Sequence, residues 1–189
     1  MASAFSHAIV AVAMGQTFRN KELGWRELFL GALCAVVPDL DVIGFHVGIE
    51  YGDLWGHRGM THSLVFAGLL AGSLVAIGYR GKPATVTAGL FLYFFLSTAS
   101  HGVLDAITSG GLGVAFFSPF DTTRYFFPVR PVLVSPVELN LFFSGRGVRV
   151  LISEAFWIWL PTCIAFLLFR AVQRFWSVRS AVSSREVKS

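Results

Sequence analysis

The segment HRGMTHS, residues 57–63, places two histidines and an arginine directly before a long apolar run. Histidines and aspartates also occur in three other short pieces, which read SH, PDLD and HGVLD. Imidazole and carboxylate groups together suit Zn²⁺, Mn²⁺ or Fe²⁺, whereas Mg²⁺ prefers oxygen ligands alone. These residues therefore predict a transition-metal site. Its candidate ligands are His7, Asp39, Asp41, His57, His62, His101 and Asp105.

The number and spacing of these ligands allow either one ion or two. His101 and Asp105 are four residues apart and share one face of a helix. The aspartate could bind the ion or orient the histidine. A catalytic zinc uses three or four ligands, so the larger set also allows two ions, which would clamp the attacking and leaving oxygens of a phosphoester. Asp39 and Asp41 are both candidates for the general base.

Simpler interpretations exist for each piece. PDLD could be a turn, Thr61 or Ser63 could cap the next helix, and the two residues of HGVLD could form an internal pair. Arg58 could hold an anionic substrate oxygen as part of the catalytic site, or it could extend to the lipid headgroups. Ionisable groups near the hydrocarbon are costly and usually mark function. Their convergence therefore favours the metal site.

The composition is that of a membrane protein. The chain has 189 residues, of which 54% are hydrophobic and 14% charged, whereas soluble domains are about one quarter charged. The mean hydropathy is +0.66. The net charge of +4 arises from short basic clusters between apolar runs, which is typical of membrane topology and argues against nucleic acid as a partner. Cys34 and Cys163 lie in apolar runs and are expected to be core residues without a disulfide.

Five apolar segments must position the candidate ligands. A membrane-spanning helix needs about 20 residues, and three segments approach that length while two are shorter or interrupted. We therefore predict an all-α membrane protein with four to five transmembrane or half-spanning helices and a long interfacial loop. Residues 1–170 would form one hydrolase-like domain, and 171–189 a basic, disordered cytoplasmic tail. The three longer segments are 63–79, 84–107 and 150–169, the two shorter ones are 2–18 and 28–45, and the loop is 108–149.

Alternation of the segments predicts where the candidate ligands lie. If all five cross the membrane, the ends that carry the ligands return to the same face. Ten of the fifteen Lys and Arg residues then fall on the other side, in 19–27, 79–83 and the tail. Cytoplasmic loops of membrane proteins carry an excess of Lys and Arg. This distribution therefore predicts a cytoplasmic C-terminus and a metal site on the outer face.

The order of the motifs resembles a known family. The sequence is similar to the YdjM-type inner-membrane metal-dependent hydrolases of bacteria and archaea in SH at His7, PDLD at 38–41, HRGMTHS at 57–63, HGVLD at 101–105 and SPFD at 118–121. The resemblance implies a multi-pass protein of the inner membrane that carries out metal-dependent hydrolysis. A more distant similarity to zinc-dependent phospholipase C, in its ordered histidines and aspartates, suggests a phosphoester substrate.

Three functions follow in order of preference. The first is a hydrolase that cleaves a lipid or lipid-linked phosphoester at the outer interface, with membrane lipids as partners and zinc, manganese or iron as cofactor. The second is a metal sensor or carrier, although transport sites usually lie at the midplane of the membrane. The third is a structural protein. The sequence contains no GxSxG or P-loop motif, so serine hydrolysis and nucleotide binding have no support. It indicates no oligomeric state.

Overall fold

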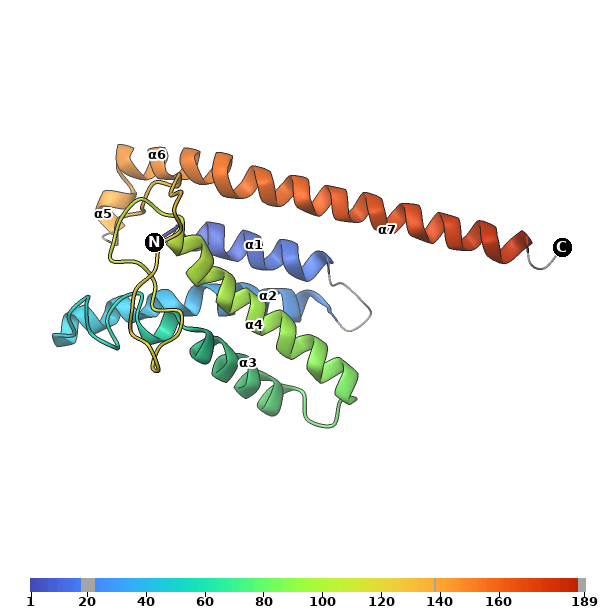
Figure 1. The fold of residues 1–189 in the computed structure, drawn as a ribbon, viewed down its shortest axis with the longest axis horizontal. Coiled ribbons are helices and arrows are strands. Elements are labelled where there is room, and N and C mark those ends of the chain that lie inside the picture. Colours follow the sequence, from blue (N-terminus) through green and yellow to red (C-terminus); the bar gives the residue numbers. More distant parts are fainter. Residues whose placement is uncertain (18–22, 138, 187–189) are drawn as a thin grey trace.

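The computed structural model describes residues 1–17, 23–137 and 139–186, and within these ranges the fold is all-helical (Figure 1). The described residues form no strand, only two isolated bridges, Thr108 with Val132 and Val114 with Tyr125. The predicted fold class is confirmed. The α-helices are α1 (Ala4–Thr17), α2 (Trp25–Val36), α3 (Leu64–Gly78), α4 (Ala84–Ala106), α5 (Leu139–Phe142), α6 (Gly145–Glu154) and α7 (Leu160–Glu186), with tighter 3₁₀ turns η1 (Val37–Val47) and η2 (Met60–His62), and a π-helical turn η3 (Ala155–Trp159).

In the described part of the chain, three helical stretches are long and apolar enough to cross a membrane: Trp25–Val47, Ala84–Ala106 and Gly145–Ser177. The first joins α2 to η1 without a break, although the sequence suggested an interrupted segment. Pro38 lies in the first turn of η1, where a missing N–H is tolerated. The chain therefore tightens to a 3₁₀ helix and does not turn.

Two segments are shorter than the hydrocarbon core. Helix α3 has 15 residues and α1 has 14. At about 1.5 Å per residue each covers roughly 21–23 Å, whereas the core is about 30 Å thick. Residues 63–79 were expected to approach a full span, and the structure gives a shorter helix there.

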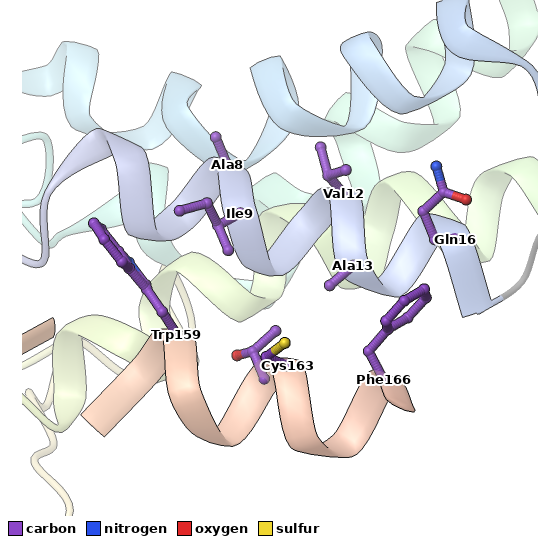
Figure 2. Close-up of a pocket in the computed structure, with 9 residues that line it drawn as sticks. Ala8, Ile9, Val12, Ala13, Gln16, Trp159, Cys163 and Phe166 are labelled. Atoms are coloured by element: carbon purple, nitrogen blue, oxygen red, sulfur yellow. The ribbon is translucent and has the colours of Figure 1, made fainter. Parts of the chain in front are cut away.

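Helix α7 extends well beyond the other helices (Figure 1). It continues to Glu186, so it includes most of the segment 171–189 for which disorder was predicted; residues 187–189 lie outside the described part. Its first turns pack against α1, and the two helices border an apolar groove of about 510 Å³ (Figure 2). Val12 from α1 and Cys163 and Phe166 from α7 line this groove.

Helices α1, α2 and α4 pack closely through glycines. The Tyr93 hydroxyl of α4 donates to the carbonyl oxygen of Ala11 at 3.2 Å, and its ring lies where a Cβ on Gly15 or Gly31 would point. The absence of these two side chains therefore allows three helices to meet around one tyrosine.

Substituting Gly31 with alanine is expected to lower stability by about 1–3 kcal/mol, because the new methyl group would overlap the buried Tyr93 side chain. Thermal unfolding of the purified protein in detergent measures the effect. Gly89→Ala is the control, since nothing lies within 4 Å of a Cβ at Gly89. Equal melting temperatures for the two variants would contradict this account of the packing.

The helix ends that carry the candidate ligands meet at one end of the molecule. The start of α1, the end of α2 with η1, η2 before α3, and the end of α4 all lie there (Figure 1). The loop from Thr108 onward covers this end, and its two bridges fix its course. Successive helices from α1 to α4 run in alternating directions (Figure 1), as the sequence indicated, and motifs that are distant in the sequence therefore lie at the same end of the molecule.

Candidate metal centre

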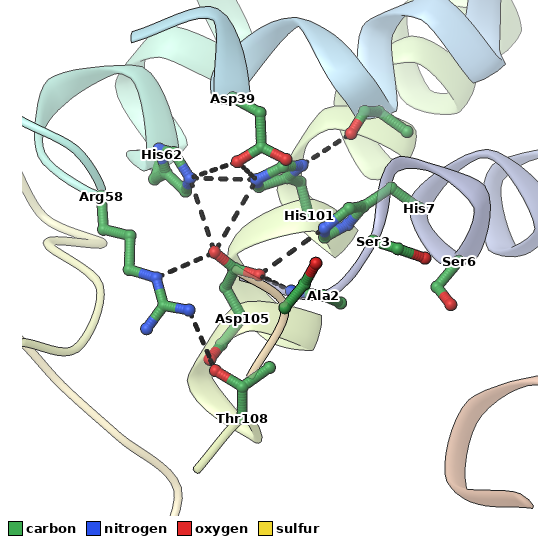
Figure 3. Close-up of polar contacts among 12 residues, drawn as sticks. Ala2, Ser3, Ser6, His7, Asp39, Arg58, His62, His101, Asp105 and Thr108 are labelled. Carbon is green, nitrogen blue, oxygen red and sulfur yellow. Dashed lines mark hydrogen bonds and ion pairs between the residues drawn. The ribbon is translucent and has the colours of Figure 1, made fainter. Parts of the chain in front are cut away.

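Four acidic and imidazole side chains converge in the buried interior of this end. One ligand atom from each of Asp39, His62, His101 and Asp105 lies within 4.8 Å of every other, and all four side chains are buried. Asp39 comes from η1, His62 from η2, and the other two from successive turns of α4 (Figure 3). The same-face placement predicted for HGVLD therefore brings both of its residues into the group.

The distances in this group suit a single transition-metal ion. The two imidazole Nε2 atoms are 2.9 Å apart. Their distances to Oδ1 of Asp39 are 3.8 and 3.3 Å, and to Oδ2 of Asp105 they are 3.7 and 4.0 Å. Ligand bonds of about 2.0–2.1 Å at tetrahedral angles separate ligand atoms by roughly 3.3–3.4 Å. The group therefore has the spacing of a metal-binding set.

The tautomers of the two histidines follow from their outer partners. His101 Nδ1 lies 2.6 Å from the carbonyl oxygen of Ala35, so this nitrogen carries the proton. His62 Nδ1 lies 3.2 Å from Oδ2 of Asp41 and 3.1 Å from the Thr61 hydroxyl, which itself donates to Asp41 at 2.7 Å. Nδ1 of His62 is therefore a donor as well. Such outer hydrogen bonds are typical of metal-ligating histidines.

With both Nδ1 atoms protonated, two bare Nε2 lone pairs face each other. The carboxylate of Asp39 adds two more acceptors, and neither of its oxygens has a hydrogen-bond partner among the described residues. Buried acceptors without donors are costly, so a cation at the centre, either a metal ion or a proton on His62, would satisfy them. Burial disfavours the charged form of His62, but the carboxylates of Asp39 and Asp41 outweigh it and raise its pKa to about 9. These carboxylates thus favour positive charge at this position.

Asp41, His57 and His62 form a second, overlapping group. Asp41 Oδ1 lies 2.7 Å from Nδ1 of His57, and its Oδ2 accepts from the backbone N–H of Arg58 at 3.2 Å and from Thr61. Asp41 therefore holds both histidines of HRGMTHS. This group is either a second ion site or the outer support of the first.

Arg58 is fully buried, which excludes the interpretation that it extends to the headgroups. Its Nε donates to Oδ2 of Asp105 at 2.9 Å, and its terminal nitrogens donate to the Gly110 carbonyl at 2.8 Å and the Thr108 hydroxyl at 2.9 Å. Its backbone φ is +66°, an uncommon conformation for a non-glycine residue. Arg58 thus balances the charge of Asp105, and a contact with substrate stays a prediction.

His7 lies beside the four-residue group. Its ring stacks on His101 at 3.7 Å between centroids, and Nε2 is 3.6 Å from Oδ1 of Asp105. Neither ring nitrogen has a hydrogen-bond partner in the described part of the chain. Its role as a ligand stays a prediction, which the unpaired, buried ring supports.

The sequence reasoning missed a network that positions α1. The backbone N–H of Ala2 donates to Oδ1 of Asp105 at 2.7 Å. The fully buried carboxylate of Glu154 accepts from Ser3 and from the hydroxyl of Ser6, the latter at 2.7 Å, and Trp159 donates to Ser6 at 2.8 Å. The sequence feature that could have indicated this network is Glu154, the single acidic residue of the apolar segment 150–169.

Arg124 was missed as well. Its guanidinium donates to the carbonyl oxygen of His57 at 2.8 Å, and to those of Tyr51 and Asp53 at 2.9 and 3.1 Å. It follows the SPFD motif, whose Asp121 accepts from the Tyr125 hydroxyl at 2.9 Å. This part of the loop therefore fixes the segment before HRGMTHS rather than supplying a ligand.

Substituting Arg124 with lysine is expected to loosen residues 51–59, because a lysine cannot reproduce the three carbonyl contacts of the planar guanidinium. Amide hydrogen exchange in this segment should rise by roughly tenfold, with little change in α4. Arg130→Lys is the control, since Arg130 lies over the Phe126 ring at 4.4 Å and makes no contact with this segment in the described structure. Unchanged exchange in the Arg124 variant would show that the loop is held by other contacts.

Comparison with known proteins agrees with this architecture. Residues 1–177 match the family described as YdjM inner membrane protein. The inner membrane protein YbcI of Escherichia coli (strain K12) is 39% identical over 161 residues, which cover 85% of this chain and 92% of YbcI. No solved structure matches the chain. The chain therefore belongs to the YdjM family of inner membrane proteins.

Proposed function

We propose that this protein is a membrane-embedded, metal-dependent hydrolase that cleaves a phosphoester of a lipid or lipid-linked substrate. The observation that carries the proposal is the convergence of two bare imidazole nitrogens and two carboxylates on one buried point. Zinc suits this ligand set best, with manganese or iron as alternatives. A second ion would use Asp41 and His57.

The donor set matches the chemistry that such a reaction needs. A divalent ion, when bound, supplies Lewis acidity toward a phosphoryl oxygen and makes hydroxide available near neutral pH. Asp39 is the better candidate for a ligand or general base, because both of its oxygens lack hydrogen-bond partners in the described structure. Asp41 already accepts from Thr61 and contacts both histidines, so we assign it the positioning of His57 and His62.

The place of the site supports a lipid substrate. The cluster lies at the common end of the helices, next to a loop that exposes large apolar side chains, including Phe117 and Phe120. Large exposed apolar side chains of this kind suit a surface that contacts the membrane, whose phosphate headgroups would then lie close to the cluster. By the distribution of basic residues, we propose that this end faces away from the cytoplasm.

One observation favours a sensor without catalysis. Four protein ligands complete a tetrahedral set, whereas catalytic zinc sites keep a position open for water or substrate. The deep burial of the group also restricts access. In that case the metal would stabilise one arrangement of η1, η2 and α4 and would not activate a substrate.

The two functions are separated by a hydrolysis assay on detergent-solubilised phospholipids and lipid-linked pyrophosphates. If the protein is a hydrolase, the wild type releases phosphate or phosphorylated headgroup, and Asp39→Asn and His57→Ala each abolish turnover while remaining folded. His46→Ala is the control, because His46 is exposed and belongs to neither group. Bound metal without any turnover would favour the sensor. Full activity in Asp39→Asn and His57→Ala would refute the catalytic assignment.

A further inference from the structure

Helix α6 and the loop before it border a small, partly open pocket that the metal centre does not use. Its volume is about 290 Å³. Its lining residues come from α6 and from the loop after α4, and these segments lie at the same end of the molecule as the helix ends that carry the candidate metal ligands (Figure 1). The lining residues are Ser109, Leu133, Val134, Arg146, Arg149 and Val150.

The loop after α4 holds Ser109, which contributes a hydroxyl group to this lining, in place. Ser109 donates its backbone N–H to the carbonyl oxygen of Val132 at 2.8 Å. Its hydroxyl oxygen accepts the N–H of Val134 at 3.2 Å, which leaves the hydroxyl proton free to donate. The neighbouring Thr108 and Gly110 accept from Arg58, so the segment is held from its other side too.

The charged groups of the pocket are both cations. Arg146 and Arg149 are three residues apart and share one face of α6. Neither guanidinium has a hydrogen bond or ion pair with any residue that the structure describes, and none of the described residues that line the pocket is acidic. The acidic residue of α6, Glu154, is buried and engaged with Ser3 and Ser6. Among the described residues, this concave site offers donors and positive charge without a counterion, which fits an anion, and guanidinium groups match phosphate oxygens.

The surroundings of α6 indicate where such a phosphate comes from. The helix opens the candidate span Gly145–Ser177, so its first turns lie at the membrane interface. Phe143 is 83% exposed, and Val148 and Ile152 are also exposed. Apolar side chains beside arginines that have no partner in the described structure suit a helix that lies among lipid headgroups.

From this combination we propose that Arg146, Arg149 and Ser109 bind the phosphate of an anionic glycerophospholipid in the leaflet on the side of the metal centre. The site is separate from the four-residue metal group and does not require hydrolysis. Arg58 links the two neighbourhoods, because it bonds to Asp105 of the metal group and to Thr108 and Gly110, the two residues that flank Ser109. A lipid bound here would lie next to the segment that supports the metal centre.

Native mass spectrometry of the full-length protein, titrated with phosphatidylglycerol in detergent, tests the proposal. Arg146→Gln and Arg149→Gln should each weaken binding by roughly tenfold, because each removes a charge-assisted contact. Ser109→Ala should weaken it less, since it removes one neutral donor. Arg130→Gln removes the same charge outside the pocket and should change binding less than about twofold. Metal content should stay at the wild-type level in all four variants, which keeps this test independent of the proposed hydrolase.

The other outcomes are equally decisive. Equal weakening by Arg130→Gln would show general attraction between lipid and positive charge and would overturn the pocket. Unchanged binding in both Arg146→Gln and Arg149→Gln would overturn it as well. Inorganic phosphate that displaces the lipid at equal concentration would show a site for soluble phosphate and would refute the lipid assignment. Melting temperatures close to wild type are expected, because both arginine side chains are exposed and without partners in the described structure.

Discussion

His101→Ala is expected to remove the bound metal from the purified protein. In the structure Nε2 of His101 faces Nε2 of His62 at 2.9 Å, and its Nδ1 proton is held by the carbonyl oxygen of Ala35. Loss of this imidazole leaves three of the four converging groups. Because even outer partners of a metal ligand change affinity by about 10–100-fold, loss of a direct ligand should lower affinity by at least about a hundredfold.

Elemental analysis of protein prepared without chelators measures this effect. The wild type should contain a transition metal in stoichiometric amount, and His101→Ala almost none. His46→Ala removes a histidine that is exposed and outside both groups, so it should retain the metal. A wild type without metal would refute the metal centre itself. A metal-loaded His101→Ala with a normal melting temperature would place the ion elsewhere.

The Arg58→Met variant is expected to lose about 3–5 kcal/mol of stability, which is the usual cost of breaking a buried ion pair. Arg58 and Asp105 are both fully buried and joined at 2.9 Å. Methionine fills much of the same volume without the charge, so the loss reports the unpaired carboxylate rather than an empty cavity. Thermal unfolding in detergent measures it, with Arg130→Met as an exposed control.

A double-mutant cycle separates this ion pair from general packing. Asp105→Asn removes the negative charge, and the double variant should be more stable than the sum of the two single losses predicts. Additive losses would show that Arg58 stabilises the loop through Thr108 and Gly110 alone. Unchanged stability of Arg58→Met would contradict the charge-balancing role.

The candidate ligands and their common location could be predicted from the sequence, because costly side chains in an apolar chain are visible by type. Alternation of apolar segments placed Asp39, His62 and His101 at one end without any knowledge of the helix boundaries, and the i, i+4 spacing put His101 and Asp105 on one face. The all-helical membrane fold could also be predicted, because apolar composition and the lengths of the apolar segments can be read directly from the sequence. The exact lengths did not, since propensity cannot show that Pro38 tightens the helix and does not break it.

The grouping of these ligands was decided by the tertiary structure. No spacing rule shows that Asp41 contacts His57 and His62 from outside, while Asp39 presents two unpaired oxygens to the four-residue group. The role of Arg58 depended on burial, which follows from loop packing and not from its position between two histidines. Glu154 and Arg124 contribute through contacts with residues far away in the sequence. Such contacts depend on how the helices and loops pack against one another. The hydrophobic pattern and the residue types specify which face of a helix is buried, but they do not specify which side chains meet across the packed elements.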